Sequence, residues 1–180
     1  MRRRMGRPLG RMFAPDIPPL LRRANQLMSE GKYAEAADAL EQLARAAEAR
    51  GGPRAPFFHL QAGRARAMAK QPQQAVESLE RGLGLFATRG QTGKVANFGT
   101  RVVAELKQHG FPAEAQQLTE YVRGLAPGIE ASASSSVPAK RPVLPTHCPG
   151  CGAPVRPDEV EWLDSSTAEC AFCGSPVRGT

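Results

Sequence analysis

The feature that most constrains this chain is a phrase that occurs twice near its end, Cys-x-x-Cys-Gly-x-Pro-Val-Arg. The first copy runs from Cys148 to Arg156, and the second runs from Cys170 to Arg178. Together the two copies contain all four cysteines of the 180-residue chain. Two Cys-x-x-Cys pairs with about 15–20 residues between them are typical of a site where four thiolates bind one metal ion. A segment this short cannot build a sufficient hydrophobic core, so we expect the metal to hold it together.

We predict that the metal is one structural zinc ion and that its ligands are Cys148, Cys151, Cys170 and Cys173. Two residues between paired cysteines allow a tight turn that directs both sulfurs to one point, and Gly152 and Gly174 free the backbone where each turn tightens. Four thiolates complete a tetrahedral site and leave no open position for water or substrate. Between the pairs, residues 159–164 alternate in polarity and residues 167–170 follow a Ser-Ser turn. This pattern predicts a short hairpin that returns Cys170 to the metal.

Residues 146–178 resemble a zinc ribbon. An iron site uses the same four ligands, so the spacing leaves iron open as an alternative. A thioredoxin-like redox pair would begin a helix, whereas each pair here is followed by Gly-x-Pro. A disulfide framework is disfavoured by the reducing compartment that we expect. We expect His147 to be a bystander beside the four cysteines and Trp162 to pack under them as a small core.

The middle of the chain contains three similar stretches at a nearly constant interval. They are GKYAEAADALEQLA (31–44), KQPQQAVESLERGL (70–83) and GFPAEAQQLTEYVR (110–123). Their alanines Ala36, Ala75 and Ala115 are 39 and 40 residues apart. Another helical stretch precedes each one, at 19–30, 56–70 and 92–109. Together they predict three helix–turn–helix units, punctuated by glycine after helices and by proline at helix starts.

These units resemble tetratricopeptide repeats, and ANQLMSEGKYAEAADALEQLA is the best match among them. The interval is longer than that family's usual 34 residues, and the third unit is degenerate. The expected fold class is therefore mainly α, with TPR-like helical hairpins in a solenoid and a small β zinc ribbon. The alternative is an unrelated alanine-rich helical bundle.

The resemblance implies a concave groove lined by the first helix of each unit. In such a groove a protein or peptide partner would contact five residues. These are Asn25, Phe57, Leu60, Arg64 and Lys107.

Composition divides the chain into four parts. We expect a disordered Arg-rich leader over 1–17, a TPR-like repeat domain over 18–124, a flexible linker over 125–145 and a zinc ribbon over 146–180. Met12 is an alternative start that would remove most of the leader.

The charge is distributed unevenly along the chain, whose net charge is +7. The segment 146–180 has two arginines, Arg156 and Arg178, against five acidic residues, so its net charge is −3. Phosphate binding needs clustered lysine and arginine, which makes nucleic-acid binding through the ribbon unexpected. The electrostatics favour a protein partner, or packing of the ribbon against the leader or the repeats. Because the leader is basic, the alternative function is a nucleic-acid- or ribosome-associated factor that uses it.

No enzyme signature is present: the sequence has no Gly-rich phosphate loop, no catalytic Ser/His/Asp or Cys/His constellation and no His-Glu-x-x-His. No apolar run approaches the length of a membrane span, and no secretory signal is apparent, so we expect a cytoplasmic protein. We therefore predict a non-catalytic interaction or scaffold protein. A metal- or redox-sensing regulator is a further alternative, and the sequence leaves the partner and the oligomeric state open.

Overall fold

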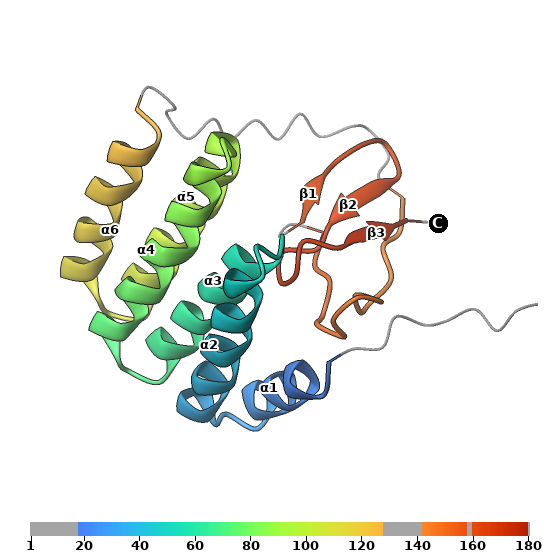
Figure 1. The fold of residues 1–180 in the computed structure, drawn as a ribbon, viewed down its shortest axis with the longest axis horizontal. Coiled ribbons are helices and arrows are strands. Elements are labelled where there is room, and N and C mark those ends of the chain that lie inside the picture. Colours follow the sequence, from blue (N-terminus) through green and yellow to red (C-terminus); the bar gives the residue numbers. More distant parts are fainter. Residues whose placement is uncertain (1–17, 128–141, 158–159, 180) are drawn as a thin grey trace, which may run out of the picture.

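The computed structural model describes residues 18–127, 142–157 and 160–179. Within them lie six helices followed by a small three-stranded antiparallel sheet (Figure 1). The mainly helical prediction is thus confirmed. The leader expected over 1–17 and most of the linker expected over 125–145 lie outside the described residues.

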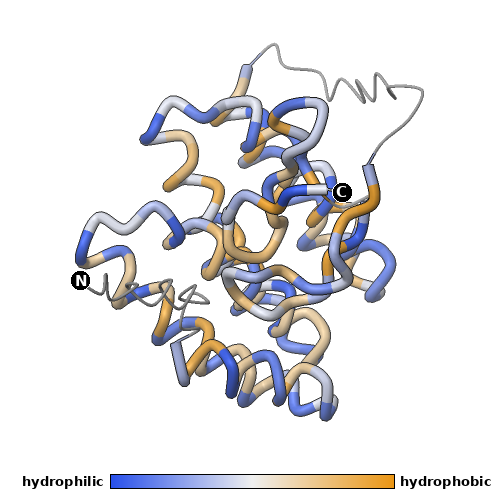
Figure 2. The backbone as a smooth tube through the Cα atoms, turned by 90° about the vertical axis from the view of Figure 1, so that its right-hand side faces the viewer, coloured by the Kyte–Doolittle hydropathy of each residue, from blue (hydrophilic) through white to orange (hydrophobic). Residues whose placement is uncertain are grey.

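The helices agree with the six predicted stretches to within a few residues, except that two of them extend further at their ends. Their bounds are α1 Pro19–Ser29, α2 Tyr33–Ala49, α3 Ala55–Met68, α4 Pro72–Thr88, α5 Thr92–Gln108 and α6 Pro112–Leu125. Proline occupies the first turn of α1, α3, α4 and α6, where its missing N–H has no helical partner to lose. Along the helices, hydrophobic and hydrophilic positions alternate (Figure 2).

All five turns between consecutive helices end the preceding helix in the same way. After α1, the N–H of Gly31 donates to the carbonyl of Met28 and the N–H of Lys32 donates to the carbonyl of Leu27. This Schellman pair satisfies carbonyls that the helix leaves open, and it requires a left-handed residue after the cap. The left-handed residues at the five turns are Gly31, Gly51, Lys70, Gly90 and Gly110.

Glycine allows neighbouring helices to approach closely. A Cβ placed on Gly63 of α3 would lie 2.6 Å from Cγ of Leu79 and 2.9 Å from the carbonyl oxygen of Ala75, both in α4. In the other direction, a Cβ on Gly82 of α4 would lie 2.9 Å from the carbonyl oxygen of Pro56. These glycines inside helices therefore serve packing, which outweighs their low helix propensity.

The sheet lies in the cysteine module, by which we mean residues 142–157 and 160–179. Strand β1 (Glu161–Trp162) pairs with β2 (Thr167–Glu169), and β2 pairs with β3 (Pro176–Arg178). The carboxylate of Asp164 accepts hydrogen bonds from the N–H groups of Ser166 and Thr167 and so fixes the turn between β1 and β2. The predicted hairpin is confirmed, whereas β3 was not predicted.

The cysteine module packs against the helices and shares their core. One hydrophobic cluster joins α1, α2 and α3 to the four cysteines, and a second joins α3 through α6 to Ala171. Helix α3 contributes to both, with Phe58 in the first and Phe57 in the second. Twelve of its 14 residues are buried, because the other helices and the cysteine module cover it from several sides. None of the described helices has the length and apolar character needed to cross a membrane.

Candidate metal centre and helical groove

The two copies of the repeated phrase fold into the same local structure. In the first, the N–H of Gly150 points to Sγ of Cys148 at 3.3 Å, and the N–H of Gly152 donates to the carbonyl of Cys148 at 2.8 Å. In the second, the N–H of Phe172 points to Sγ of Cys170 at 3.4 Å, and the N–H of Gly174 donates to the carbonyl of Cys170 at 2.8 Å. We call residues 148–153 the first knuckle and residues 170–175 the second knuckle.

The glycine of each knuckle has the conformation that the sequence predicted. Gly152 has φ +73° and Gly174 has φ +68°, a region that residues with a Cβ rarely adopt. Each turn is closed by a further bond, from Cys148 N–H to the carbonyl of Ala153 and from Cys170 N–H to the carbonyl of Ser175. Backbone N–H groups aimed at a sulfur stabilise a thiolate more than a thiol.

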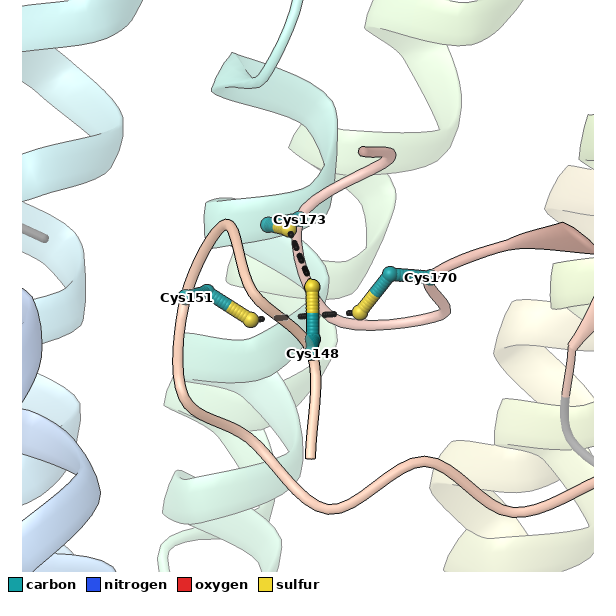
Figure 3. Close-up of side chains that lie close together, drawn as sticks. All are labelled: Cys148, Cys151, Cys170 and Cys173. Atoms are coloured by element: carbon teal, nitrogen blue, oxygen red, sulfur yellow. Dashed lines mark hydrogen bonds between the residues drawn. The ribbon is translucent and has the colours of Figure 1, made fainter. Parts of the chain in front are cut away.

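The four sulfurs converge on one point (Figure 3). All four Sγ atoms lie within 4.8 Å of one another, and all four side chains are buried. The Sγ atoms of Cys148 and Cys173 are 3.8 Å apart, as are those of Cys151 and Cys170. A disulfide would bring two sulfurs to about 2.05 Å, so these cysteines are unpaired. A tetrahedron with metal–sulfur distances of about 2.3 Å has edges of about 3.8 Å, so the cluster has the size of a four-thiolate metal site.

The crowding of the thiols changes how readily they lose their protons. The pKa of Cys148 falls to about 7, because the thiols of Cys151 and Cys170 donate hydrogen bonds to its thiolate. The same contacts, together with burial, raise the pKa of Cys151, because its proton is held between neighbouring sulfurs. A divalent cation would replace these shared protons, and metal binding here should therefore release protons.

Two aromatic residues beside the cluster differ in their placement. His147 is exposed, and its Nδ1 lies 3.1 Å from Oγ1 of Thr146, outside the cluster of four cysteines. Trp162 is partly buried and packs on the hydrophobic cluster that contains the cysteines. Trp162 therefore occupies the place of the small core that the sequence predicted.

Polar contacts from three helices hold the knuckles. Asn25 of α1 donates from Nδ2 to the carbonyl of Cys151 at 2.8 Å, and Gln61 of α3 donates from Nε2 to the carbonyl of Ala171 at 3.4 Å. Arg54, just before α3, donates from Nη2 to Oγ of Ser175 at 2.7 Å. Lys94 of α5 forms an ion pair with Glu169, and both side chains are largely buried. The acidic module thus contacts two cations of the helical part, Arg54 at Ser175 of the second knuckle and Lys94 at Glu169 just before it.

Aromatic contacts complete this interface. The ring of Phe57 lies so close to Gly174 that a Cβ on that glycine would be 2.4 Å from Cε2 of the ring. The guanidinium of Arg64 lies over the ring of Phe172, 5.9 Å from its centroid, and forms an ion pair with Glu105 of α5. These contacts fix the second knuckle directly on α3.

A cavity of about 600 Å³ remains between the helices and the first knuckle. On the helical side, the cavity is lined by Met28 of α1, Met68 of α3 and Val102 of α5, among others. On the other side it is lined in part by Ala153, the last residue of the first knuckle, and by Pro154, which follows it. Apolar side chains dominate this lining, and the Arg64–Glu105 ion pair supplies a polar group within it. We refer to this space and the adjoining knuckle-binding surface as the groove.

Three of the five residues predicted to bind a partner lie either at the cavity or at the second knuckle. Asn25 and Arg64 line the cavity, and Phe57 contacts the second knuckle. Leu60 is 2% exposed and packs in the core against Gly82. Lys107 is exposed at the end of α5 and does not line the cavity. Partner binding by these five residues stays a prediction.

Three of the residues that hold the module, namely Arg54, Gln61 and Lys94, were not among the residues predicted from the sequence. The only signal for Arg54 and Lys94 was electrostatic, because an acidic module favours packing against a basic surface, and the neutral Gln61 had no such signal. That signal could not select individual residues, since more than 70 residues separate each of them from its contact.

Comparisons with protein-family models, with curated proteins and with solved structures found no match to this chain.

Proposed function

We propose that the protein is a non-catalytic interaction protein in which a TPR-like helical array and a zinc ribbon together present a groove to an extended segment of a partner protein. The proposal of a zinc site rests on the 3.8 Å spacing of paired Sγ atoms, which fits a tetrahedral zinc site. Cys148, Cys151, Cys170 and Cys173 would hold the ion, which would supply folding free energy to the ribbon. Four thiolates leave zinc no position for substrate, which supports a structural role over catalysis.

The TPR-like assignment rests on the regular helical hairpins. Consecutive helices pack against one another, and α3 with α5 and α4 with α6 make further contacts. The small residues Ala36, Gly63, Ala75 and Ala115 are all buried, and Gly63 lies against Ala75 where α3 and α4 meet. This is the pattern expected when each hairpin covers the apolar face of its neighbour.

The lining of the cavity supports a protein or peptide partner. Apolar side chains with a few polar groups at fixed positions are typical of sites that bind organic or peptide ligands. Amide groups such as those of Asn25 and Gln61, which here bond backbone carbonyls, suit the main chain of an extended peptide. Together with the expected cytoplasmic location, this favours a protein partner.

The proposed zinc site is tested by elemental analysis of the purified full chain, for which we expect one zinc per chain. Iron in place of zinc would contradict the assignment of the metal. The absence of both would contradict the ribbon itself.

The groove is tested with a photo-crosslinking amino acid at position 68, where Met68 lines the cavity. The matched control carries the same amino acid at position 45, because Arg45 is exposed on α2 away from the cavity. We expect one protein to be captured at position 68 and not at position 45. Equal capture at both positions would contradict a specific groove.

A further inference from the structure

The second knuckle lies on α3 in the manner of a bound peptide. Gln61 donates to the main-chain carbonyl of Ala171, Arg64 lies over the ring of Phe172, and Phe57 packs against the bare Cα of Gly174. One main-chain contact, one aromatic contact and one close backbone approach are the kinds of contact that recognise an extended segment. The groove residues proposed to bind a partner are therefore partly engaged by the chain itself.

The shape of each knuckle depends on the cysteines. Each knuckle is a six-residue turn whose cysteine side chains are its main buried groups. The carbonyls that Asn25 and Gln61 bond belong to Cys151 and Ala171, so a cysteine or its direct neighbour presents them. A module this small has only a minor core around Trp162, so an ion shared by the four sulfurs would supply much of the free energy that holds its turns.

We propose that metal binding to the cysteine cluster covers the part of the groove formed by Phe57 and Gln61 with the second knuckle and that loss of the metal uncovers it. This inference rests on the proposed function, because it concerns the same metal and the same groove. The occupant is residues 170–175 of this chain, and Phe57 and Gln61 are the side chains that it covers. Metal binding and docking of the knuckles are then linked equilibria, and each must strengthen the other by the same factor.

Linkage makes the first test quantitative, because helical residues that do not touch the sulfurs must affect metal affinity. The variant is Asn25→Leu/Gln61→Leu, which removes two hydrogen-bond donors to the knuckles and keeps side chains of similar size. The control is Gln26→Leu/Gln74→Leu, at two exposed positions whose side chains do not reach the module. Zinc affinity of each full-length protein is measured by competition with a chromophoric chelator. We expect roughly tenfold or greater weakening in the variant and no change in the control.

The second test measures exposure directly in the unmodified chain. Hydroxyl-radical footprinting of the full-length protein is compared with and without chelator. Phe57 is 4% exposed beneath the second knuckle, whereas Phe86 is 1% exposed inside the helices and serves as the internal control. We expect oxidation of Phe57 to rise several-fold on chelation and oxidation of Phe86 to stay constant.

The outcomes separate this inference from the proposed function. A chain that takes up no zinc would contradict both. If zinc binds with equal affinity in the variant and the control, or if Phe57 stays protected after chelation, the groove does not depend on the metal and only this inference is overturned. A joint rise at Phe57 and Phe86 would also overturn it, because the helices themselves would then have opened.

Discussion

Lys70 is the one described residue other than glycine with a positive φ, at +61°. It stands at the turn between α3 and α4, where the other four inter-helix turns use glycine. Its side chain reaches the turn between α5 and α6, because Nζ donates to the carbonyl of His109 at 3.0 Å and lies 5.3 Å from the centroid of the Phe111 ring. Lys70 therefore connects two adjacent turns, and its side-chain contacts offset the strain of its left-handed backbone.

This balance predicts an order of stability for two variants at position 70. Lys70→Ala keeps the left-handed strain, which is about 1–2 kcal/mol for a residue with a Cβ, and loses both side-chain contacts. Lys70→Gly loses the same contacts but relieves the strain, offset in part by the greater freedom of glycine in the unfolded chain. We expect Lys70→Gly to be more stable than Lys70→Ala by about 1 kcal/mol in urea unfolding of the zinc-loaded protein. Equal stability would show that the turn carries no strain.

Burial of His59 makes the free energy of unfolding depend on pH. Burial lowers the pKa of His59 below its ordinary value of about 6.5, and the Glu48 carboxylate, 2.8 Å from Nε2, offsets only part of this effect. Below about pH 6.5 the unfolded chain therefore binds a proton at this position that the folded chain resists. The free energy of unfolding must fall as pH decreases through this window and level off only below the folded pKa.

The corresponding prediction compares the wild type with His59→Gln in excess zinc between about pH 7.5 and 5.5. Subtracting the two curves removes the contributions of the cysteines and carboxylates that both proteins share. We expect the wild type to lose more stability than the variant as the pH falls. Parallel curves would contradict a buried, neutral imidazole at this position.

At the scale of elements, the contact between α3 and α4 depends on glycine. Gly63→Ala would place a methyl group 2.6 Å from Leu79 and 2.9 Å from a backbone oxygen, so the helices would have to separate. Overpacking of this kind costs about 1–3 kcal/mol, which outweighs the roughly 1 kcal/mol that alanine gains in a helix. We expect net destabilisation in thermal unfolding followed by circular dichroism.

The matched control is Gly93→Ala in α5, where no heavy atom outside the local helix lies within 4 Å of the added methyl group. There only the helix propensity changes, so stability should stay constant or rise by up to about 1 kcal/mol. If both substitutions acted in the same direction, propensity rather than packing would decide the role of these glycines.

The helices could be predicted because their signals are local. Proline at helix starts, glycine after helix ends and the repeated alanines all act within a few residues of the boundaries that they set. Strand β3 was missed because three residues beginning with Pro176 give no alternation to detect. The clustering of the four cysteines was predicted from their spacing alone, whereas the contact of Asn25 with Cys151 spans 126 positions and depends on how the whole chain packs.

At the scale of the molecule, the cysteine module joins both hydrophobic clusters and should couple their unfolding. Trp162 is the only tryptophan in the chain and lies in this module, so its fluorescence reports on the module while circular dichroism reports on the helices. With zinc bound, we expect the two signals to change at the same temperature. After chelation we expect the Trp162 signal to be lost first and the helices to melt at a lower temperature than in the loaded protein. Identical melting curves with and without chelator would contradict this coupling.

The order of synthesis gives the contact between Arg54 and Ser175 a further meaning. These residues are 121 positions apart, so the helical side of the contact leaves the ribosome long before its partner is made. At about 5–20 residues per second, the interval is roughly 6–24 seconds. During that time the part of α3 that the second knuckle later covers, including Phe57, stays uncovered, and the nascent chain is more vulnerable to proteases and to misassembly. Docking of the second knuckle thus completes the burial of the central helix only after all six helices have been made, and under the proposed metal site the availability of metal at that moment would decide whether docking occurs.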